Sequence, residues 1–134
     1  MAKNKIIHTS GKRKLAVARA TLKPGTGKVT INNCSLDTWG TELLRMRVRE
    51  PLILANKHAD KIDIAVTTAG GGSTGQADAT RLAIGRALIE LDEKLQPVLL
   101  DYDRMLLVAD VRRKEPAKPN SHGKARAKRQ KSYR

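Results

Sequence analysis

Three consecutive glycines, Gly70–Gly72, separate an alternating apolar segment from the longest amphipathic segment of the chain. Before them, the isoleucines and the valine of Lys61–Thr68 alternate with other residues, which predicts a strand. After them, Gln76–Leu95 places apolar residues at helical spacing, which predicts one long helix. A glycine run costs backbone entropy and adds no packing, so this turn must need positive φ angles or the close approach of another group. The chain is therefore expected to contain a strand, a tight turn and a helix in direct succession.

The start of this helix has two interpretations. Ser73 and Gln76 have the spacing of a capping box, which would fix where the helix begins. Free N–H groups at the positive end of a helix dipole also bind phosphate. The segment is not a P-loop, because Gln76 follows Gly75 where that motif requires Lys. A tight turn that packs helix on strand and a contact with an RNA backbone both stay open.

Small residues and alternation predict the rest of the body. The helix carries an alanine at every fourth position, a ridge typical of close packing on a sheet: Ala79, Ala83 and Ala87. Lys5–His8 and Arg13–Leu22 are expected to be extended, the latter with alanines at 16, 18 and 20 on one face. Lys28–Asn32 is expected to form a hairpin with Arg13–Leu22 across the turn Pro24–Gly27. These segments together give an α/β pattern.

Other segments are less regular. Ser35–Trp39 fits a single helical turn capped by its serine, and Arg45–Arg49 fits a strand or a helix. Pro51 suits the first turn of a short helix ending near Asn56, because its missing N–H needs no partner there. Pro97–Leu107 is expected to be a second, shorter helix.

Positive charge is concentrated at the two ends of the chain. The 134 residues carry 27 Lys and Arg against 13 Asp and Glu. Residues 1–36 hold eight cations and no acid, and residues 112–134 hold ten cations and one acid. Residues 37–111, with nine cations and twelve acids, are net −3. This uneven distribution indicates a polyanionic partner, and nucleic acid is the densest one available.

The C-terminal segment Pro116–Arg134 cannot build a core. It holds seven cations, no acid and one sizeable apolar side chain, Tyr133. Burial therefore cannot offset the roughly 1–2 kcal/mol per residue of backbone entropy lost on ordering. We predict a globular body over residues 1–109 and an extended basic tail over residues 110–134 that a partner orders. A membrane is disfavoured as that partner, because the tail has neither an apolar helix face nor a lipidation motif.

Composition narrows the partner further. The only aromatic residues are Trp39, Tyr102 and Tyr133, which argues against a surface that stacks single-stranded bases. Nucleic acid would then be held mainly through phosphates and shape. The single Cys34 excludes an internal disulfide and is expected to be a small buried residue. Without an apolar run long enough to span a bilayer or a signal peptide, the expected compartment is a reducing cytoplasm.

Catalytic and metal-binding patterns are missing from the sequence. The three histidines are scattered, and no His or Cys spacing fits a metal site. Asp101 and Asp103 are interpreted as a solvated helix face rather than as paired catalytic acids. We therefore expect no cofactor, no metal and no enzymatic activity.

The glycine turn and the helix that follows, Gly70–Leu88, resemble the signature of the small-subunit ribosomal protein nine family. The resemblance covers most of the chain and includes further segments: Gly11–Lys14 with Ala16 and Ala18–Arg19, Val29–Asn32, Arg49–Leu52, Ala109–Arg113 and Gln130–Arg134. The ending and the short N-terminus resemble the archaeal branch, with the eukaryotic branch close behind.

This resemblance implies a structural role in the head of the small ribosomal subunit. The implied fold is α+β, with a βαβ-rich, two-layer α/β domain similar to the second domain of ribosomal protein five of that subunit. Family members pack this body on rRNA. Their tail reaches the anticodon stem-loop of the peptidyl-site tRNA. The residues implied to contact this tRNA are Arg134, Lys131, Arg129 and Lys128. The residues implied to bind rRNA are Lys12, Arg13, Lys14, Gly70, Gly71, Gly72, Ser73, Arg112, Arg113, Lys124 and Arg126.

Partners and alternatives complete the expectation. Neighbouring head proteins are expected partners, and a homo-oligomer is not expected. A free-standing basic RNA- or DNA-binding factor would show the same charge pattern. The family fold also occurs in some kinases, so fold alone does not exclude an enzyme.

Overall fold

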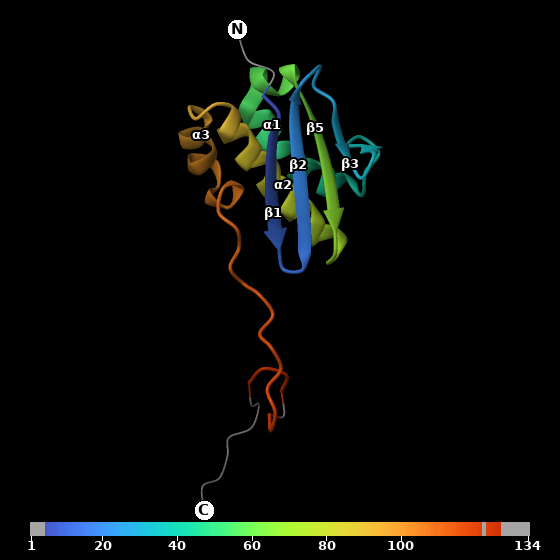
Figure 1. The fold of residues 1–134 in the computed structure, drawn as a ribbon, viewed down its shortest axis with the longest axis vertical. Helices are drawn as coiled ribbons and strands as arrows, with labels where there is room; N and C mark the ends of the chain where they lie inside the picture. The colour runs from blue at the N-terminus through green and yellow to red at the C-terminus, as the bar shows by residue number, and fades with distance from the viewer. Residues whose placement is uncertain (1–4, 122, 127–134) are drawn as a thin grey trace, which may run out of the picture.

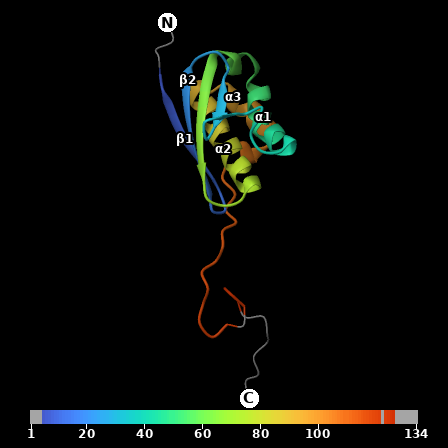
Figure 2. The ribbon, with the colours of Figure 1, turned by 90° about the vertical axis from the view of Figure 1, so that its right-hand side faces the viewer.

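Five strands and three α-helices form the body of the chain in the computed structural model, which describes residues 5–121 and 123–126. The helices lie together on one face of a mixed sheet (Figures 1 and 2). The opposite face of β1, β2 and β5 carries the exposed members of each alternating strand. The predicted α+β class is confirmed.

The sheet has the strand order β1-β2-β5-β3-β4. Its strands are β1 (Ile7–Arg13), β2 (Ala16–Pro24), β3 (Val29–Ile31), β4 (Cys34–Ser35) and β5 (Ile62–Ala69). Strand β2 pairs antiparallel with both β1 and β5, whereas β3 pairs parallel with β5 and antiparallel with β4. The parallel neighbours β3 and β5, with a helix between them in sequence, make one βαβ unit.

The predicted hairpin between Arg13–Leu22 and Lys28–Asn32 is wrong. The hairpin is formed instead by β1 and β2 across Lys14–Leu15, because the strand expected to end at His8 continues to Arg13. Strand β5 occupies the place beside β2 that β3 was expected to fill. Alternation predicted which residues are extended, but the partner of a strand depends on contacts distant in sequence.

The helices are α1 (Glu42–Ala55), α2 (Ser73–Leu91) and α3 (Leu95–Tyr102). The 3₁₀ turn η1 (Asn56–Lys61) follows α1, and the 3₁₀ turn η2 (Arg104–Leu106) follows α3. The open alternative at Arg45–Arg49 is resolved as helix. The helix expected to begin at Pro51 begins at Glu42 instead, and this proline lies inside α1 on its buried face. The long helix predicted to run to Leu95 ends at Leu91. None of the described helices is long and apolar enough to cross a membrane.

Two smaller expectations have different outcomes. Ser35–Trp39 does contain a hydrogen-bonded turn, in which Thr38 N donates to Ser35 O at 3.1 Å. Cys34, expected to be buried, is exposed. It lies in the two-residue strand β4, where both residues are exposed because this strand forms the outer edge of the sheet.

The core lies between α2 and the inward faces of β1 and β2. The predicted ridge of alanines is confirmed, because every member on either side is fully buried: Ala79, Ala83 and Ala87 on α2, and Ala16, Ala18 and Ala20 on β2. The closest approach is at Gly11 of β1. A Cβ on Gly11 would lie 2.2 Å from the carbonyl oxygen of Ala79 and 2.8 Å from the nitrogen of Ala83. Gly11 therefore sets how near α2 lies to the sheet.

The substitution Gly11→Ala tests this contact. We expect it to lower the free energy of unfolding by about 1–3 kcal/mol, because the added methyl meets helix backbone that cannot rotate away. Urea unfolding followed by circular dichroism measures the change, with Ser10→Ala as the control on the neighbouring outward-facing position. A Gly11→Ala protein as stable as the control would contradict the close packing.

Candidate nucleic-acid interface

The glycine turn packs directly against the β1–β2 turn. Gly70 and Gly71 have φ angles of 75° and 62°, in the left-handed region. A Cβ on Gly70 would lie 2.7 Å from the carbonyl oxygen of Leu15, and one on Gly71 would lie 2.9 Å from the nitrogen of Ala16. Positive φ and close approach both require glycine here. The packing interpretation of the turn is thus confirmed for its first two residues.

Gly72 differs from the two glycines before it. It is the extended N-cap of α2, with φ −102° and ψ 174°, and a Cβ there would meet no atom of the described chain within 4 Å. The predicted capping box is wrong, because Ser73 is already helical and caps nothing by its side chain. Gln76 instead donates from Nε2 to the carbonyl oxygen of Gly70 at 3.1 Å. The space above Gly72 is left open by the fold.

The N-terminal basic motif occupies the β1–β2 turn beside these glycines. Lys12 and Lys14 are exposed, and neither pairs with an acid in the part of the chain that the structure describes. Lys14 also adopts a φ of 55°, which is uncommon for a side chain of this kind. Arg13 is different, since its side chain is only 18% exposed and lies 2.8 Å from Asp110 and 3.8 Å from Asp78.

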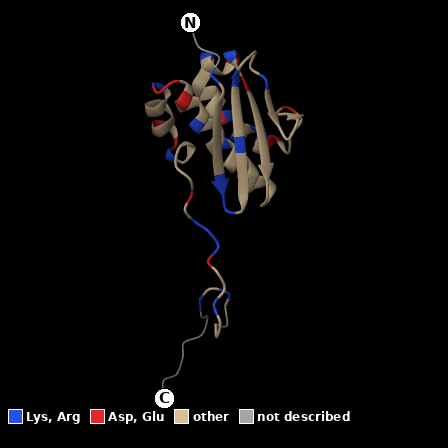
Figure 3. Ribbon diagram, in the orientation of Figure 1, with Lys and Arg blue, Asp and Glu red and all other residues tan. Residues whose placement is uncertain are grey.

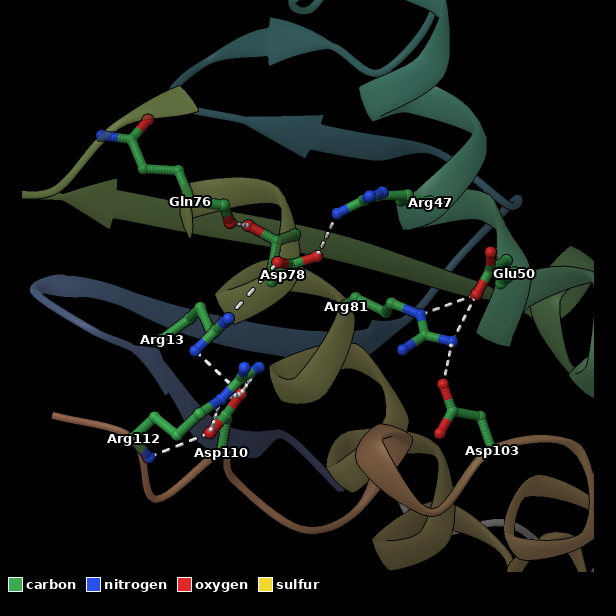
Figure 4. A network of polar contacts seen from close by, with 10 residues as sticks. Arg13, Arg47, Glu50, Gln76, Asp78, Arg81, Asp103, Asp110 and Arg112 are labelled. Atoms are coloured by element: carbon green, nitrogen blue, oxygen red, sulfur yellow. Dashed lines mark hydrogen bonds and ion pairs between the residues drawn. The ribbon is translucent and has the colours of Figure 1, made fainter. Parts of the chain in front are cut away.

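The start of the predicted tail joins the same surface (Figure 4). Asp110 accepts from Arg112 at 2.7 Å as well as pairing with Arg13, and Arg113 donates to the carbonyl oxygen of Lys14 at 2.6 Å. The pKa of Asp110 lies far below its usual range, because hydrogen bonds from the side chain and backbone of Arg112 stabilise the carboxylate. Two basic motifs from opposite ends of the sequence are therefore in contact.

A second ion-pair network ties the helices together (Figure 4). Arg81 of α2 donates from Nε to Glu50 of α1 at 2.7 Å and from Nη2 to Asp103 at 2.9 Å. Burial opposes the charge of Arg81, but its hydrogen bonds to both carboxylates raise its pKa. The backbone N–H of Met105 and the Arg81 guanidinium lower the pKa of Asp103. Asp101 is exposed as predicted, whereas Asp103 belongs to this network.

The β1–β2 turn, the glycine turn and the start of α2 enclose an open hollow of about 410 Å³. Its lining comes from the β1–β2 turn, the glycine turn and the first turns of α2: Arg13, Lys14, Leu15, Gly71, Gly72, Ser73, Thr74, Gly75 and Asp78. The first N–H groups of a helix have no partner within it and carry partial positive charge. The lining holds two cations, Arg13 and Lys14, and one carboxylate, Asp78. Together with the N–H groups at the start of α2, the exposed Lys14 makes the hollow attractive to an anion.

The remaining predicted residues are more widely placed. Ser73 is exposed as the first residue of α2. Lys124 is exposed, and Arg126 pairs with Glu115 at 2.7 Å within the tail. The residues predicted to contact tRNA lie outside the described residues: Lys128, Arg129, Lys131 and Arg134. No cluster of three or more metal-ligating side chains occurs within residues 5–121 and 123–126.

Sequence reasoning missed the carboxylates that organise this surface. Asp78 receives ion pairs from Arg13 and from Arg47 of α1, the latter at 3.0 Å, and Asp110 joins Arg13 to Arg112. One signal was available, because Asp110 is the last acid before the basic run Arg112–Lys114 and lies two residues from it. Nothing local marked Asp78, whose partners are supplied by β1 and α1.

Comparison with known proteins adds independent findings. The family described as ribosomal protein S9/S16 matches residues 11–134. The small ribosomal subunit protein uS9 of Methanococcus maripaludis strain C7 is 48% identical over 133 residues, which cover 97% of this chain and 99% of that protein. The protein of the same name from Thermoplasma acidophilum is 51% identical over 128 residues, covering 94% and 98%. That of Picrophilus torridus is 50% identical over 126 residues, covering 92% and 94%.

The glycine turn gives a paired prediction on stability. Gly71→Ala is expected to destabilise the protein by about 1–3 kcal/mol, because it combines a positive φ with a 2.9 Å contact to backbone. Gly72→Ala is expected to change the stability by no more than about 0.5 kcal/mol, because the lower entropy of the unfolded chain offsets the poorer N-cap. Chemical unfolding of the two purified variants measures both. Equal destabilisation would show that the fold itself requires Gly72.

Proposed function

This chain belongs to the ribosomal protein S9/S16 family and is a non-enzymatic structural constituent of the small ribosomal subunit, and we propose that its body binds rRNA while its tail contacts peptidyl-site tRNA. The three relatives compared above are archaeal, in agreement with the branch that the ending of the sequence predicted. A role in translation follows from membership of the subunit.

The contact between the two basic motifs carries the rRNA part of this proposal. The two motifs lie at opposite ends of the sequence, but in the structure Arg113 donates to the carbonyl oxygen of Lys14. This contact lies beside Gly72, above which the fold leaves open space. A phosphate backbone repeats its charge every few ångströms, so cations gathered on one edge can contact successive phosphates. Backbone N–H groups at the start of α2 would add uncharged donors to the same RNA segment.

The arginines of this surface have different proposed roles. Arg13 is largely buried between Asp78 and Asp110, so its charge is balanced within the protein and it holds the tail exit to β1. The Arg112 side chain is 77% exposed although it is bonded to Asp110. Arg112 can therefore turn from that carboxylate to a phosphate without leaving a buried charge unpaired.

For the tail we propose a tether from this surface to the tRNA. The last helical turn of the body, η2, ends at Leu106, and the pairs at Asp110 and Arg113 fix where the chain departs. Residues 116–134 would span roughly 63–68 Å if fully extended, at about 3.3–3.6 Å per residue. We propose residues 110–134 as the tail and assign its tRNA contacts to Lys128, Arg129, Lys131 and Arg134.

The helical layer offers a surface for neighbouring proteins of the subunit. Leu43, Met46 and Ile53 of α1 are 63%, 52% and 71% exposed, and Val98 and Tyr102 of α3 are also exposed. Large exposed apolar side chains are typical of protein interfaces. We assign the predicted protein partners to this layer. The predicted likeness of the fold to the second domain of ribosomal protein five stays a prediction.

Removal of residues 128–134 tests the role of the tail. We expect unchanged thermal unfolding, because the segment has no core-forming residues, but weaker binding of peptidyl-site tRNA to reconstituted small subunits. Filter binding at several salt concentrations measures the tRNA affinity, and K128R/K131R is the charge-preserving control. Equal tRNA affinity of truncated and intact subunits at every salt concentration would overturn the assignment.

Replacement of both exposed turn lysines tests the body. K12Q/K14Q is expected to weaken binding to transcribed small-subunit rRNA and to reduce the slope of log K against log salt by about 1.4–1.8, since each lost phosphate contact removes about 0.7–0.9. The control K57Q/K61Q removes the same charge from exposed positions of η1. Equal losses in the two double variants would mean that only net charge matters and that the turn is not the interface.

A further inference from the structure

The arginines that the structure describes divide into two groups by their partners. Most are engaged within the protein, either with a carboxylate or with a backbone carbonyl: Arg13, Arg45, Arg47, Arg49, Arg81, Arg86, Arg112, Arg113 and Arg126. Among the arginines that the structure describes, Arg19 and Arg104 alone lack such a partner. Arg104 lies on η2 in the helical layer, whereas Arg19 lies at the centre of the open face of the sheet.

The strand register places small hydroxyl groups on both sides of Arg19. Ser10 of β1 and Thr67 of β5 are its cross-strand neighbours. The next outward-facing row contains His8 and Thr21, with His8 Nδ1 3.1 Å from Thr21 Oγ1. These residues line a shallow hollow of about 500 Å³. The exposed Arg19 side chain thus lies among uncharged hydroxyl groups, which can form hydrogen bonds but cannot neutralise its charge.

The charge of this face is one-sided. Strands β1 and β2 contain no acid, since the first acid of the chain is Asp37, and Figure 3 shows blue without red along both strands. The one outward acid on β5, Asp63, accepts from the backbone N–H groups of Thr26 and Lys28 at 2.8 and 3.0 Å. Its carboxylate is therefore engaged by the turn at the far end of the strand. Lys12, one row from Arg19, links this face to the β1–β2 turn.

The same face lacks what a protein partner would need. The large exposed apolar residues of the described chain lie on helices, turns and termini, and none lies within β1, β2 or β5. Protein interfaces have an apolar centre, whereas nucleic-acid interfaces are polar and positively charged. No aromatic residue stands on these strands either, so stacking of bases is not the expected mode.

We propose that the open face of the sheet is a second RNA-binding surface, on which Arg19 binds a backbone phosphate and the hydroxyls of Ser10, Thr21 and Thr67 bond neighbouring phosphate or ribose oxygens. The inference rests on the proposed function, because it takes rRNA as the polyanion. It extends the RNA footprint from the β1–β2 turn across the width of β1, β2 and β5. The small side chains at 65, 67 and 69 of β5 let a bulky backbone approach.

Arginine variants of the full-length protein test the proposal by equilibrium binding to transcribed small-subunit rRNA. R19A is expected to bind roughly fivefold to tenfold more weakly, with a salt slope reduced by about 0.7–0.9, whereas R104A should bind like wild type. R19K should recover most of the slope, because it keeps the charge while losing the bidentate geometry. Identical binding of R19A and R104A would overturn the proposal.

A second pair of variants guards against a folding artefact. Thr67→Glu places a carboxylate opposite Arg19, which should leave thermal unfolding unchanged or slightly raise the melting temperature while weakening rRNA binding. Thr67→Gln is the neutral control of the same size. If T67E binds rRNA as tightly as T67Q, Arg19 is not a phosphate ligand.

Cleavage of rRNA from a tethered iron chelate identifies the occupant in assembled subunits. Cys34 is the only cysteine and is exposed, so a C34S background allows a single attachment site at T67C. Strong local cleavage of rRNA from position 67 supports the proposal, and cleavage no greater than from K57C contradicts it. If the wild-type protein and R19A bind rRNA equally well, only the proposal for this surface is refuted. If the wild-type protein itself does not bind rRNA, the proposed function is refuted as well.

Discussion

The close approach of α2 to β1 and β2 determines where the glycine turn, the β1–β2 turn and the ion pairs around Asp78 lie. Alanines face alanines across the contact, and Gly11 leaves room for the backbone of α2 itself. Thr9 of β1 reinforces the contact by donating to the carbonyl oxygen of Ala83 at 2.8 Å. A helix held this near must begin directly above the β1–β2 turn. The chain can make that connection only through glycines whose backbone crosses Leu15 and Ala16.

The same contact explains how the surface charges are organised. Since Ala77 and Ala79 face the core, Asp78 between them points to the side of α2, where Arg13 and Arg47 reach it. One turn further along, Arg81 meets carboxylates from α1 and from the segment after α3. The helical layer thus neutralises most of its own charge. Lys12 and Lys14 of the β1–β2 turn and Arg19 of the open face have no acidic partner among the described residues, so their positive charge is available to a partner.

The sequence could predict the features that depend on local burial. The strand at Lys61–Thr68 and the alanine ridge of α2 were found because alternation and fourfold spacing report directly which face is buried. Pairing could not be found in this way, since β5 enters between β2 and β3 from far along the chain. The turn at Lys14 was hidden for a different reason, because a lysine at a φ of 55° carries none of the usual turn signals.

Charge counting identified the basic ends of the chain, but only the structure distinguishes free cations from engaged ones. Arg13 and Arg19 count equally as basic residues of the N-terminal region. In the structure, Arg13 lies between two carboxylates, whereas Arg19 pairs with no carboxylate of the described residues. Arg13 and Asp110 are largely buried, and the cost of removing such a pair from water offsets much of its attraction. The acids near Arg13 therefore serve mainly to position β1, α2 and the tail exit. An unpaired arginine among small hydroxyl side chains has no comparable structural use. Its charge is available to a partner, which is why we assign the open face of the sheet, together with the basic ends, to the proposed RNA-binding surface.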